Sequence, residues 1–245
     1  MVLLLGANGY IGSQFQKHLD ERRIPWETVS HTQIDYTKAD ELEQLLDDRQ
    51  PSFVINCAGY TGKPNVDACE EKSNQGTCTY LNAIFPTILR MECERKEIEW
   101  LHVSSGCIYA GGTIYNSVTR DLRPYAYDPG AISGFKEDVP PNFSFTKPPC
   151  SFYSGTKALG EAALSGGNGY VCRLRIPFNS TPDPRNYITK LLKYDKYYDN
   201  VNSISHTDDF VTACLNLMES DAPHGIYNVV NPGYITTKKV LNMMI

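Results

Sequence analysis

Clustered metal ligands, long apolar runs and an excess of positive charge are all missing from this 245-residue sequence. Its eight cysteines form no CxxC pair and stand near no histidine cluster with zinc spacing, so no metal site is expected. The N-terminal apolar run, MVLLL, is too short for a signal peptide or a membrane span. A formal net charge of −5 disfavours nucleic acid and anionic membranes as main partners. These absences favour a reduced, cytoplasmic protein that binds neither nucleic acid nor membrane.

Short apolar runs alternate with helical periodicity along most of the chain. The expected strands are 2–5, 26–30, 52–59, 99–105, 170–178 and 225–230, and the expected helices are 10–23, 38–48, 78–96, 151–164, 186–194 and 208–219. Pro86 should kink or break the third of these helices. Alternating strands and helices predict right-handed crossovers and a parallel sheet with both faces buried. The expected fold class is therefore α/β, a Rossmann-like doubly wound parallel sheet with a small C-terminal substrate-binding lobe.

The domain organisation follows from the same pattern. We expect a dinucleotide-binding Rossmann domain over residues 1–175, and a substrate-binding lobe interleaved with late Rossmann elements over residues 176–245. Residues 111–149 are rich in glycine, proline and tyrosine and show little periodicity, which predicts an excursion near the functional site. The sequence stops within an apparent helix, KKVLNMMI, which leaves two alternatives: an abrupt end of the protein, or a lobe whose last part lies beyond this sequence.

A glycine-rich segment, GANGYIG, follows the first expected strand and opens the first helix. Gly6 permits the tight turn, Gly9 lets a pyrophosphate approach the backbone, and Gly12 lets helix and strand pack closely. The helix N-terminus then offers unpaired N–H groups to a phosphate. This strand–turn–helix context predicts a dinucleotide site. The expected contacts from this loop are Gly6, Asn8, Gly9, Tyr10, Ile11 and Gly12.

The end of the second strand bears on which dinucleotide binds. An acidic residue there would bind a ribose 2′-hydroxyl and favour NAD. The sequence instead has Ser30, His31 and Thr32, with no carboxylate before Asp35. Neutral and cationic donors suit a 2′-phosphate, so NADPH is favoured over NADH, with Ser30, His31 and Asp35 as expected contacts. His31 has a second interpretation as a solvated loop residue.

Tyr153 and Lys157 form a YxxxK pair at the start of an expected helix, so their side chains share one face. The ordinary pKa of tyrosine is about 10, and a neighbouring ammonium favours the phenolate and lowers that pKa. Such a phenol can exchange protons near neutral pH. Ser105, at the end of the preceding strand, can bind the same substrate oxygen. The joint presence of these three residues argues against the alternative of a non-catalytic NADP-binding protein.

The sequence resembles an extended short-chain dehydrogenase/reductase that acts on nucleotide sugars. The motifs that carry this resemblance are GANGYIG, NCAGYTG, LNAIFP, VSSGCIY and YSGTK. The resemblance implies that Ser105, Tyr153 and Lys157 are catalytic, and that Lys157 also holds the nicotinamide ribose. It adds five expected cofactor contacts, which are Asn56, Ala58, Gly59, Tyr60 and Asn82, and it makes Tyr153 and Lys157 cofactor contacts as well.

A narrower resemblance concerns the reaction. TGKPNVDACE, GFKEDVPPNF, SFYSGTK, PRNYITKLLKY and NVVNPG, in this order, resemble bifunctional 3,5-epimerase/4-reductases, which are related to dTDP-4-dehydrorhamnose reductase. Those enzymes make NDP-L-rhamnose from an NDP-4-keto-6-deoxy-glucose. By this resemblance Cys107 and Lys190 carry the epimerisation. The alternatives are a packed, inert Cys107, a solvated Lys190, and a 4-keto reductase without epimerase activity.

The chemistry of this reaction suits the two residues. A C4 ketone acidifies the protons at C3 and C5, and inversion needs a base on one face and a proton donor on the other. A thiol with an ordinary pKa of about 8.5, lowered by a cation, suits the first role, and a lysine suits the second. Ser105 and Tyr153 would stabilise the enolate oxygen.

Substrate contacts are expected at the carboxyl ends of the strands, where ligands of open α/β sheets bind. An arginine there would grip the substrate pyrophosphate. The expected substrate contacts are Lys63, Ser105, Gly106, Cys107, Arg175, Asn179, Arg185 and Asn186. Lys63 has an alternative interpretation as a plain surface residue. The expected partner is thus a UDP- or dTDP-linked 4-keto-6-deoxy-hexose. Oligomeric state stays open, with a homodimer through two paired helices as one candidate.

Overall fold

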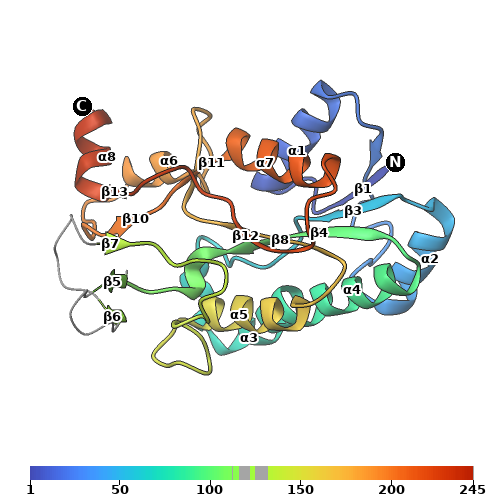
Figure 1. Cartoon of the computed structure of the whole chain (residues 1–245), viewed down its shortest axis with the longest axis horizontal. Helices are drawn as coiled ribbons and strands as arrows, with labels where there is room; N and C mark the ends of the chain where they lie inside the picture. The colour runs from blue at the N-terminus through green and yellow to red at the C-terminus, as the bar shows by residue number, and fades with distance from the viewer. Residues whose placement is uncertain (112, 116–121, 125–131, 245) are drawn as a thin grey trace.

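A computed structural model of the chain describes residues 1–111, 113–115, 122–124 and 132–244 (Figure 1). Its centre is a six-stranded parallel sheet of order β12-β8-β4-β3-β1-β2. The strands are β1 (Val2–Leu5), β2 (Trp26–Glu27), β3 (Phe53–Asn56), β4 (Glu99–Ser105), β8 (Gly169–Leu174) and β12 (Gly225–Asn228). The order reverses between β1 and β3, so the expected α/β, doubly wound fold is confirmed.

Helices cover both faces of this sheet (Figure 1). On one face lie α1 (Tyr10–Glu21) and α7 (Thr207–Glu219), and on the other lie α2 (Ala39–Arg49), α4 (Phe85–Arg95) and α5 (Phe152–Leu164). Alternate residues of a strand point to opposite faces. Leu4 accordingly packs with α1 and α7, whereas Leu3 and Leu5 pack with α2 and α4. Both faces are apolar, which is why the strand sequences show no alternation of polar residues.

Pro86 does not break the helical segment in which it lies. The segment begins earlier than predicted, with α3 (Lys72–Thr79), and passes through a π-helical turn (Tyr80–Ile84) into α4. Pro86 stands in the first turn of α4. A proline lacks the N–H that an α-helix would use here, and the wider π turn accommodates that loss.

The strand predicted over 170–178 is two strands. β8 ends at Leu174, and a short β9 (Pro177–Phe178) pairs with β11 (Ser205–His206) outside the main sheet. Between them Ile176 adopts a φ of +43°, a left-handed conformation that redirects the chain. The helix predicted over 186–194 is also shorter, and α6 covers only Tyr187–Leu191.

Residues 111–149 contain strands that the sequence did not indicate. β5 (Thr113–Tyr115), β6 (Leu122–Pro124) and β7 (Ile132–Ser133) form a small antiparallel sheet of order β6-β5-β7. The remainder of the predicted excursion at 112, 116–121 and 125–131 lies outside the described residues. Two single-turn 3-10 segments, η1 (Val66–Glu70) and η3 (Gly106–Ile108), flank the sheet edge.

The last part of the chain supplies β10 (Val201–Asn202), β13 (Ile235–Thr236) and α8 (Thr237–Met244). β10 and β13 pair antiparallel. Figure 1 shows them with α6 at the end of the molecule that also carries the β5–β7 sheet. In the part of the chain that the structure describes, every helix is too short or too polar to cross a membrane.

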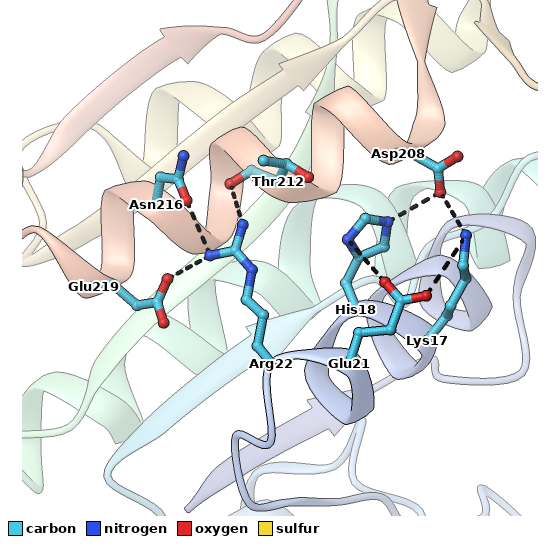
Figure 2. A network of polar contacts seen from close by, with 8 residues as sticks. All are labelled: Lys17, His18, Glu21, Arg22, Asp208, Thr212, Asn216 and Glu219. Carbon is cyan, nitrogen blue, oxygen red and sulfur yellow. Dashed lines mark hydrogen bonds and ion pairs between the residues drawn. The ribbon is translucent and has the colours of Figure 1, made fainter.

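Polar contacts join α1 to α7 along their outer sides (Figure 2). The Nε2 atom of His18 lies 3.0 Å from Oδ1 of Asp208, and Nζ of Lys17 donates to the same oxygen over 3.2 Å. Farther along, the guanidinium of Arg22 has three partners on α7, which are Thr212, Asn216 and Glu219. These contacts fix the helix pair whose N-termini face the sheet edge.

We expect Asp208→Asn to lower the free energy of unfolding by about 0.5 kcal/mol at neutral pH, a small effect because solvent screens these contacts. The hydrogen bond with His18 is the largest cause that lowers the pKa of Asp208 below its usual 3.8. Stability from a depressed carboxyl pKa is present above the unfolded pKa and is lost as the pH falls through the folded pKa. Urea unfolding of both proteins should therefore show a difference near pH 7 that shrinks at about pH 3. An equal difference at both pH values would mean that the charge of Asp208 is not what stabilises the pair.

Candidate active site

The glycine-rich loop brings the backbone of β1 close to the loop after β3. Gly6 has a φ of +74°, and a Cβ atom there would lie 2.5 Å from the backbone nitrogen of Ala58. At Gly12 a Cβ would lie 2.2 Å from the carbonyl oxygen of Gly6. Gly9 caps α1 without a side-chain hydrogen bond, so the first N–H groups of the helix are not satisfied by a side chain. Asn8 is exposed at the tip of this loop.

A cavity of about 420 Å³ opens next to this loop, at the carboxyl ends of the parallel strands. All five predicted catalytic residues line it. They are Ser105 at the end of β4, Cys107 in η3, Tyr153 and Lys157 on α5, and Lys190 on α6. Six of the predicted cofactor contacts also line it outside that set, namely Gly9, Tyr10, Ile11, Ala58, Gly59 and Asn82. Residues from distant parts of the chain thus converge on one space.

Tyr153 stands in the first turn of α5. Burial is the main cause that raises the pKa of Tyr153 above its usual 10, the charge of Cys107 adds to this, and a hydrogen bond with Ser105 opposes it. The pKa of Tyr153 is thus raised, whereas the charge of Lys157 alone was expected to lower it. Lys157 is itself only 5% exposed, and burial lowers its pKa. Burial disfavours the charged form of both groups, so the tyrosine is held in the protonated form that can donate a proton.

Cys107 lies at the turn that follows β4. Its backbone N–H donates to Oγ of Ser105 over 3.3 Å, which fixes the turn. The side chain is partly exposed and lines the cavity, and it also packs against the small apolar cluster of Ile108 and Ala158. Arg175 is close enough for the charge of Cys107 to raise its pKa against the larger lowering by burial. The charge of Cys107 acts on Lys157 in the same direction, so Arg175 and Lys157 are both candidates for the cation expected beside the thiol.

Lys190 and Arg185 reach the cavity from the opposite side. Lys190 is partly buried, and burial, followed by the neighbouring charge of Arg185, lowers its pKa. The guanidinium of Arg185 donates to Oγ1 of Thr61 and, over 3.4 Å, to the carbonyl oxygen of Gly62. Arg185 thereby joins the segment before α6 to the loop after β3.

A second cavity of about 420 Å³ lies on the other side of the Gly106–Cys107 turn. Gly106 and Arg175, two of the predicted substrate contacts, line this second cavity and not the first. The guanidinium of Arg175 donates to Oδ1 of Asn202 over 2.5 Å. Residues from five parts of the chain line its wall, including Tyr109, Gly134, Phe135, Arg173, Ser203 and Asn228.

Three predicted substrate residues do not line either cavity. Asn186 is 1% exposed, caps α6 by accepting the N–H of Ile188 over 3.0 Å, and donates to Asn179. Asn179 is 8% exposed and donates to Oγ1 of Thr207 over 2.9 Å. The amide of Asn186 is engaged because it caps α6, and that of Asn179 is engaged with Thr207 at the start of α7. Lys63 is an exposed residue of the loop after β3.

Two predicted cofactor residues support the loop after β3. Asn82 accepts the N–H of Tyr60 and donates to its carbonyl oxygen, each over 2.9 Å. Asn56 is fully buried, does not line the cavity, and accepts the N–H of Ala58 through Oδ1 over 2.9 Å. Both asparagines therefore shape the loop that faces the cavity.

The expected adenosine end lies beyond β2. Oγ of Ser30 lies 2.7 Å from Oγ1 of Thr32, and His31 lies 3.6 Å from Asp35. Sequence reasoning missed Lys38, whose Nζ lies 3.6 Å from Asp35. The hydrogen bond from Thr37 is the main cause that lowers the pKa of Asp35, with the charges of His31 and Lys38 adding to it. Lys38 could have been identified from the sequence, because it is a basic residue three positions after Asp35, the first carboxylate beyond the second strand.

Sequence reasoning also missed the surroundings of Lys157. His102, in β4, is 2% exposed, and its Nε2 atom lies 3.3 Å from Nζ of Lys157. The same Nζ donates to the carbonyl oxygen of Val103 over 3.2 Å. One turn later, buried Glu161 pairs with Arg173 of β8. A polar side chain within a buried strand requires a hydrogen-bond partner, so the histidine in the expected strand 99–105 could have indicated a buried polar contact.

Among the described residues, no group of three or more His, Cys, Asp or Glu side chains is placed to hold a metal ion. All eight cysteines are free. The polar groups of the cavity come from serine, threonine, cysteine, tyrosine, lysine, asparagine and arginine side chains and from the N-terminus of α1.

Curated relatives match nearly the whole chain. A trifunctional UDP-glucose 4,6-dehydratase/UDP-4-keto-6-deoxy-D-glucose 3,5-epimerase/UDP-4-keto-L-rhamnose-reductase of Arabidopsis thaliana is 31% identical over 98% of this chain and 33% of its own length. The bifunctional dTDP-4-dehydrorhamnose 3,5-epimerase/dTDP-4-dehydrorhamnose reductase of the same plant is 31% identical over 98% of this chain and 73% of its own length. The chain thus spans about a third of the first relative and nearly three quarters of the second.

Solved structures share the fold. The UDP-rhamnose synthase of Acanthamoeba polyphaga mimivirus superposes with a TM-score of 0.84 at 22% identity, over 99% of this chain and 79% of that one. The dTDP-4-dehydrorhamnose reductase of Bacillus anthracis, solved in complex with NADP, superposes with a TM-score of 0.70 at 18% identity, over 99% of this chain and 80% of that one. A family profile described as the RmlD substrate binding domain matches residues 1–240. The chain therefore belongs to the RmlD substrate binding domain family.

Proposed function

We propose that this protein is an NADPH-dependent nucleotide-sugar enzyme that inverts C3 and C5 of a UDP- or dTDP-4-keto-6-deoxy-glucose and then reduces C4. The product is NDP-L-rhamnose. One observation carries the proposal: Cys107 and Lys190 line the same cavity as Ser105, Tyr153 and Lys157. The bifunctional and trifunctional relatives combine these activities in their names, which supports the assignment.

The residues present fit a nicotinamide dinucleotide. The close approach at Gly6 and the uncapped start of α1 leave backbone N–H groups for a pyrophosphate. His31 and Lys38 are both more than half exposed and flank Asp35, so cations are available for a 2′-phosphate. This arrangement favours NADPH over NADH, in agreement with the NADP complex of the Bacillus anthracis relative. When bound, the cofactor would supply a hydride to C4.

The catalytic trio then completes the reduction. Ser105 and Tyr153 hold the C4 oxygen, and burial keeps Tyr153 protonated until that oxygen becomes basic. Lys157, from the same helix face, holds the ribose and adds positive charge as the phenol loses its proton. The result is a C4 alcohol and a phenolate that must regain a proton.

Epimerisation uses the two walls of the cavity. A C4 ketone acidifies the protons at C3 and C5, and Ser105 and Tyr153 stabilise the enolate oxygen that forms when either is removed. Cys107 takes the proton on one face of the sugar ring, and Lys190 returns a proton on the other. Lys190 suits this role because burial and Arg185 lower its pKa and ease its loss of a proton.

The nucleotide part of the substrate would extend past the Gly106–Cys107 turn. Arg175 in the second cavity is the natural partner of the diphosphate, since a guanidinium binds phosphate oxygens in pairs. Arg185 lines the first cavity and is a second candidate. Residues 1–175, which include Arg175, would form the cofactor domain, and residues 176–245 a substrate-binding lobe interleaved with the late Rossmann elements α7 and β12.

The proposal also includes the oligomeric state of the protein and its cellular compartment. Met91 of α4 and Leu159 of α5 are 63% and 50% exposed, which supports a homodimer through these two helices. The free state of all eight cysteines supports a reduced compartment such as the cytoplasm.

A 4-keto reductase without epimerase activity is the second candidate. Its support is the packing of Cys107 against Ile108 and Ala158, which would suit an inert thiol. A non-catalytic NADP-binding protein is disfavoured because Ser105, Tyr153 and Lys157 converge in one cavity, which cofactor binding alone does not require.

An incubation in deuterated water separates these candidates. With UDP- or dTDP-4-keto-6-deoxy-glucose and NADPH, the proposed enzyme should give NDP-L-rhamnose that carries deuterium at both C3 and C5, measured by mass spectrometry and proton NMR. Reduction without deuterium at these carbons would leave only the reductase. A protein that binds NADPH but consumes none with either sugar would overturn both enzymatic candidates.

A further inference from the structure

A buried line of polar groups runs beneath the cavity, from the loop after β3 to the catalytic lysine. Asn56 of β3, His102 of β4 and Lys157 of α5 are 0%, 2% and 5% exposed. Nδ2 of Asn56 lies 3.1 Å from Nδ1 of His102, and Nε2 of His102 lies 3.3 Å from Nζ of Lys157. The proposed function assigns a role to Lys157, but none to His102.

The contacts of Asn56 determine which nitrogen of His102 carries the proton. Oδ1 of Asn56 accepts the backbone N–H of Ala58 over 2.9 Å, so its amide nitrogen is the group that faces His102. An amide nitrogen only donates, and Nδ1 of His102 must therefore accept. A neutral imidazole that accepts at Nδ1 carries its proton on Nε2, the nitrogen that faces Lys157.

We propose that His102, held by Asn56 with its proton on Nε2, is a positioning residue that stabilises the neutral amine of Lys157. An Nε2–H group can donate to the lone pair of an amine, whereas it opposes an ammonium at the same distance. Lys157 can therefore pass a proton from Nζ to the phenolate of Tyr153 after each reduction. The N–H bond of Lys157 breaks, the O–H bond of Tyr153 forms, and a solvent proton entering through the cavity restores the ammonium.

The other groups around Lys157 are consistent with this role. Glu161 on α5 and the thiols of Cys78 and Cys107 would each favour the ammonium, but burial outweighs them and lowers the pKa of Lys157. Glu161 is held by Arg173, which neutralises its charge. Burial, and then the charge of Lys157, hold the pKa of His102 well below its usual 6.5, so the imidazole stays neutral.

Nitrogen-15 NMR of the cofactor-free protein tests the tautomer directly, and needs no substrate. The chain has five histidines, and the signal lost in His102→Gln identifies the relevant one. We expect His102 to be neutral with its proton on Nε2 from about pH 5 to about pH 9. A proton on Nδ1, or an imidazole that titrates in this range, would overturn the proposal whatever reaction the protein catalyses.

The pH profile tests the effect on Lys157, and this arm rests on the proposed function. In Asn56→Asp both carboxylate oxygens accept, so the proton of His102 moves to Nδ1 and the lone pair of Nε2 faces Lys157. The ammonium is then favoured, and the alkaline limb of the kcat profile should rise by about one pH unit, the size of one hydrogen bond to a charged group. An alkaline limb that stays in place in folded Asn56→Asp would contradict the proposal.

His18→Gln is the matched control for histidine replacement. His18 is also buried, at 9% exposure, but it bonds Asp208 on the far side of α1. This variant should keep the pH profile of the unmodified protein, together with the NMR signal of His102. A shifted profile in His18→Gln would mean that the shift reports general destabilisation, and would count against the role of His102.

Discussion

Tyr153→Phe should reduce kcat for the NADPH-dependent reduction of the 4-keto sugar by a factor of about 10³, in the range expected for loss of a general acid. The variant keeps the ring and removes only the hydroxyl that protonates the C4 oxygen. Lys157, which holds the ribose in the proposed complex, is untouched, so the dissociation constant of NADPH should change less than about threefold, or less than about 0.7 kcal/mol. Stopped-time assays of NADPH oxidation and a fluorescence titration of NADPH measure the two quantities.

Tyr170→Phe is the matched control for that measurement. The Tyr170 hydroxyl is engaged inside the protein, where it donates to the carbonyl oxygen of Ala222 over 3.0 Å. Its loss should cost about 1 kcal/mol of stability and leave kcat close to its original value. If Tyr153→Phe kept kcat within about twofold, Tyr153 would not be the proton donor, and a side chain such as Lys190 would have to take that role.

The parts of the site that the sequence could predict are those that depend on neighbours along the chain. The constraint on Gly12 is of this kind, because it comes from the backbone of Gly6 and Ala7, whereas the backbone that confines Gly6 belongs to Cys57 and Ala58, just after the adjoining strand β3. Tyr153 and Lys157 lie one helical turn apart, so helix geometry alone places them on one face. The parallel sheet followed from the alternation of apolar strands with helices, which is also a local pattern.

Directions of side chains beyond the strand ends could not be predicted in this way. Ile176 adopts a left-handed φ of +43°, and the chain leaves the sheet between Arg175 and the residues that follow. Arg175 therefore lines one cavity while Arg185 lines the other. The amide of Asn186 points inward because it caps α6, a role that depends on where this short helix begins.

The contact between His102 and Lys157 illustrates the same limit in the core. The two residues are 55 positions apart and come from different elements, so no spacing rule connects them. Their meeting depends on the register of β4 and on how α5 crosses it. The register pairs Asn56 with His102 across adjacent strands, and this pairing brings the two side chains together. The tautomer of His102 can therefore be inferred from the three-dimensional structure but not from the sequence.

Cys107→Ser should abolish deuterium incorporation at C3 and C5, at least about 100-fold below the original rate, because a hydroxyl is a far weaker acid than a thiol and its alkoxide is not populated at neutral pH. Reduction of an NDP-4-keto-L-rhamnose supplied directly should continue, since Ser105, Tyr153 and Lys157 remain. Proton NMR of the recovered sugar measures exchange, and NADPH oxidation measures reduction in the same sample.

Cys150→Ser provides the matched control, because Cys150 is also partly exposed but does not line either cavity. It should leave exchange and reduction at their original rates. Exchange that persists in Cys107→Ser would assign the proton abstraction to another group, and the packing of Cys107 against Ile108 would then be its whole role. Loss of exchange together with retained reduction separates the two activities within one cavity. That separation is expected if the thiol moves protons on carbon while the phenol moves the proton on oxygen.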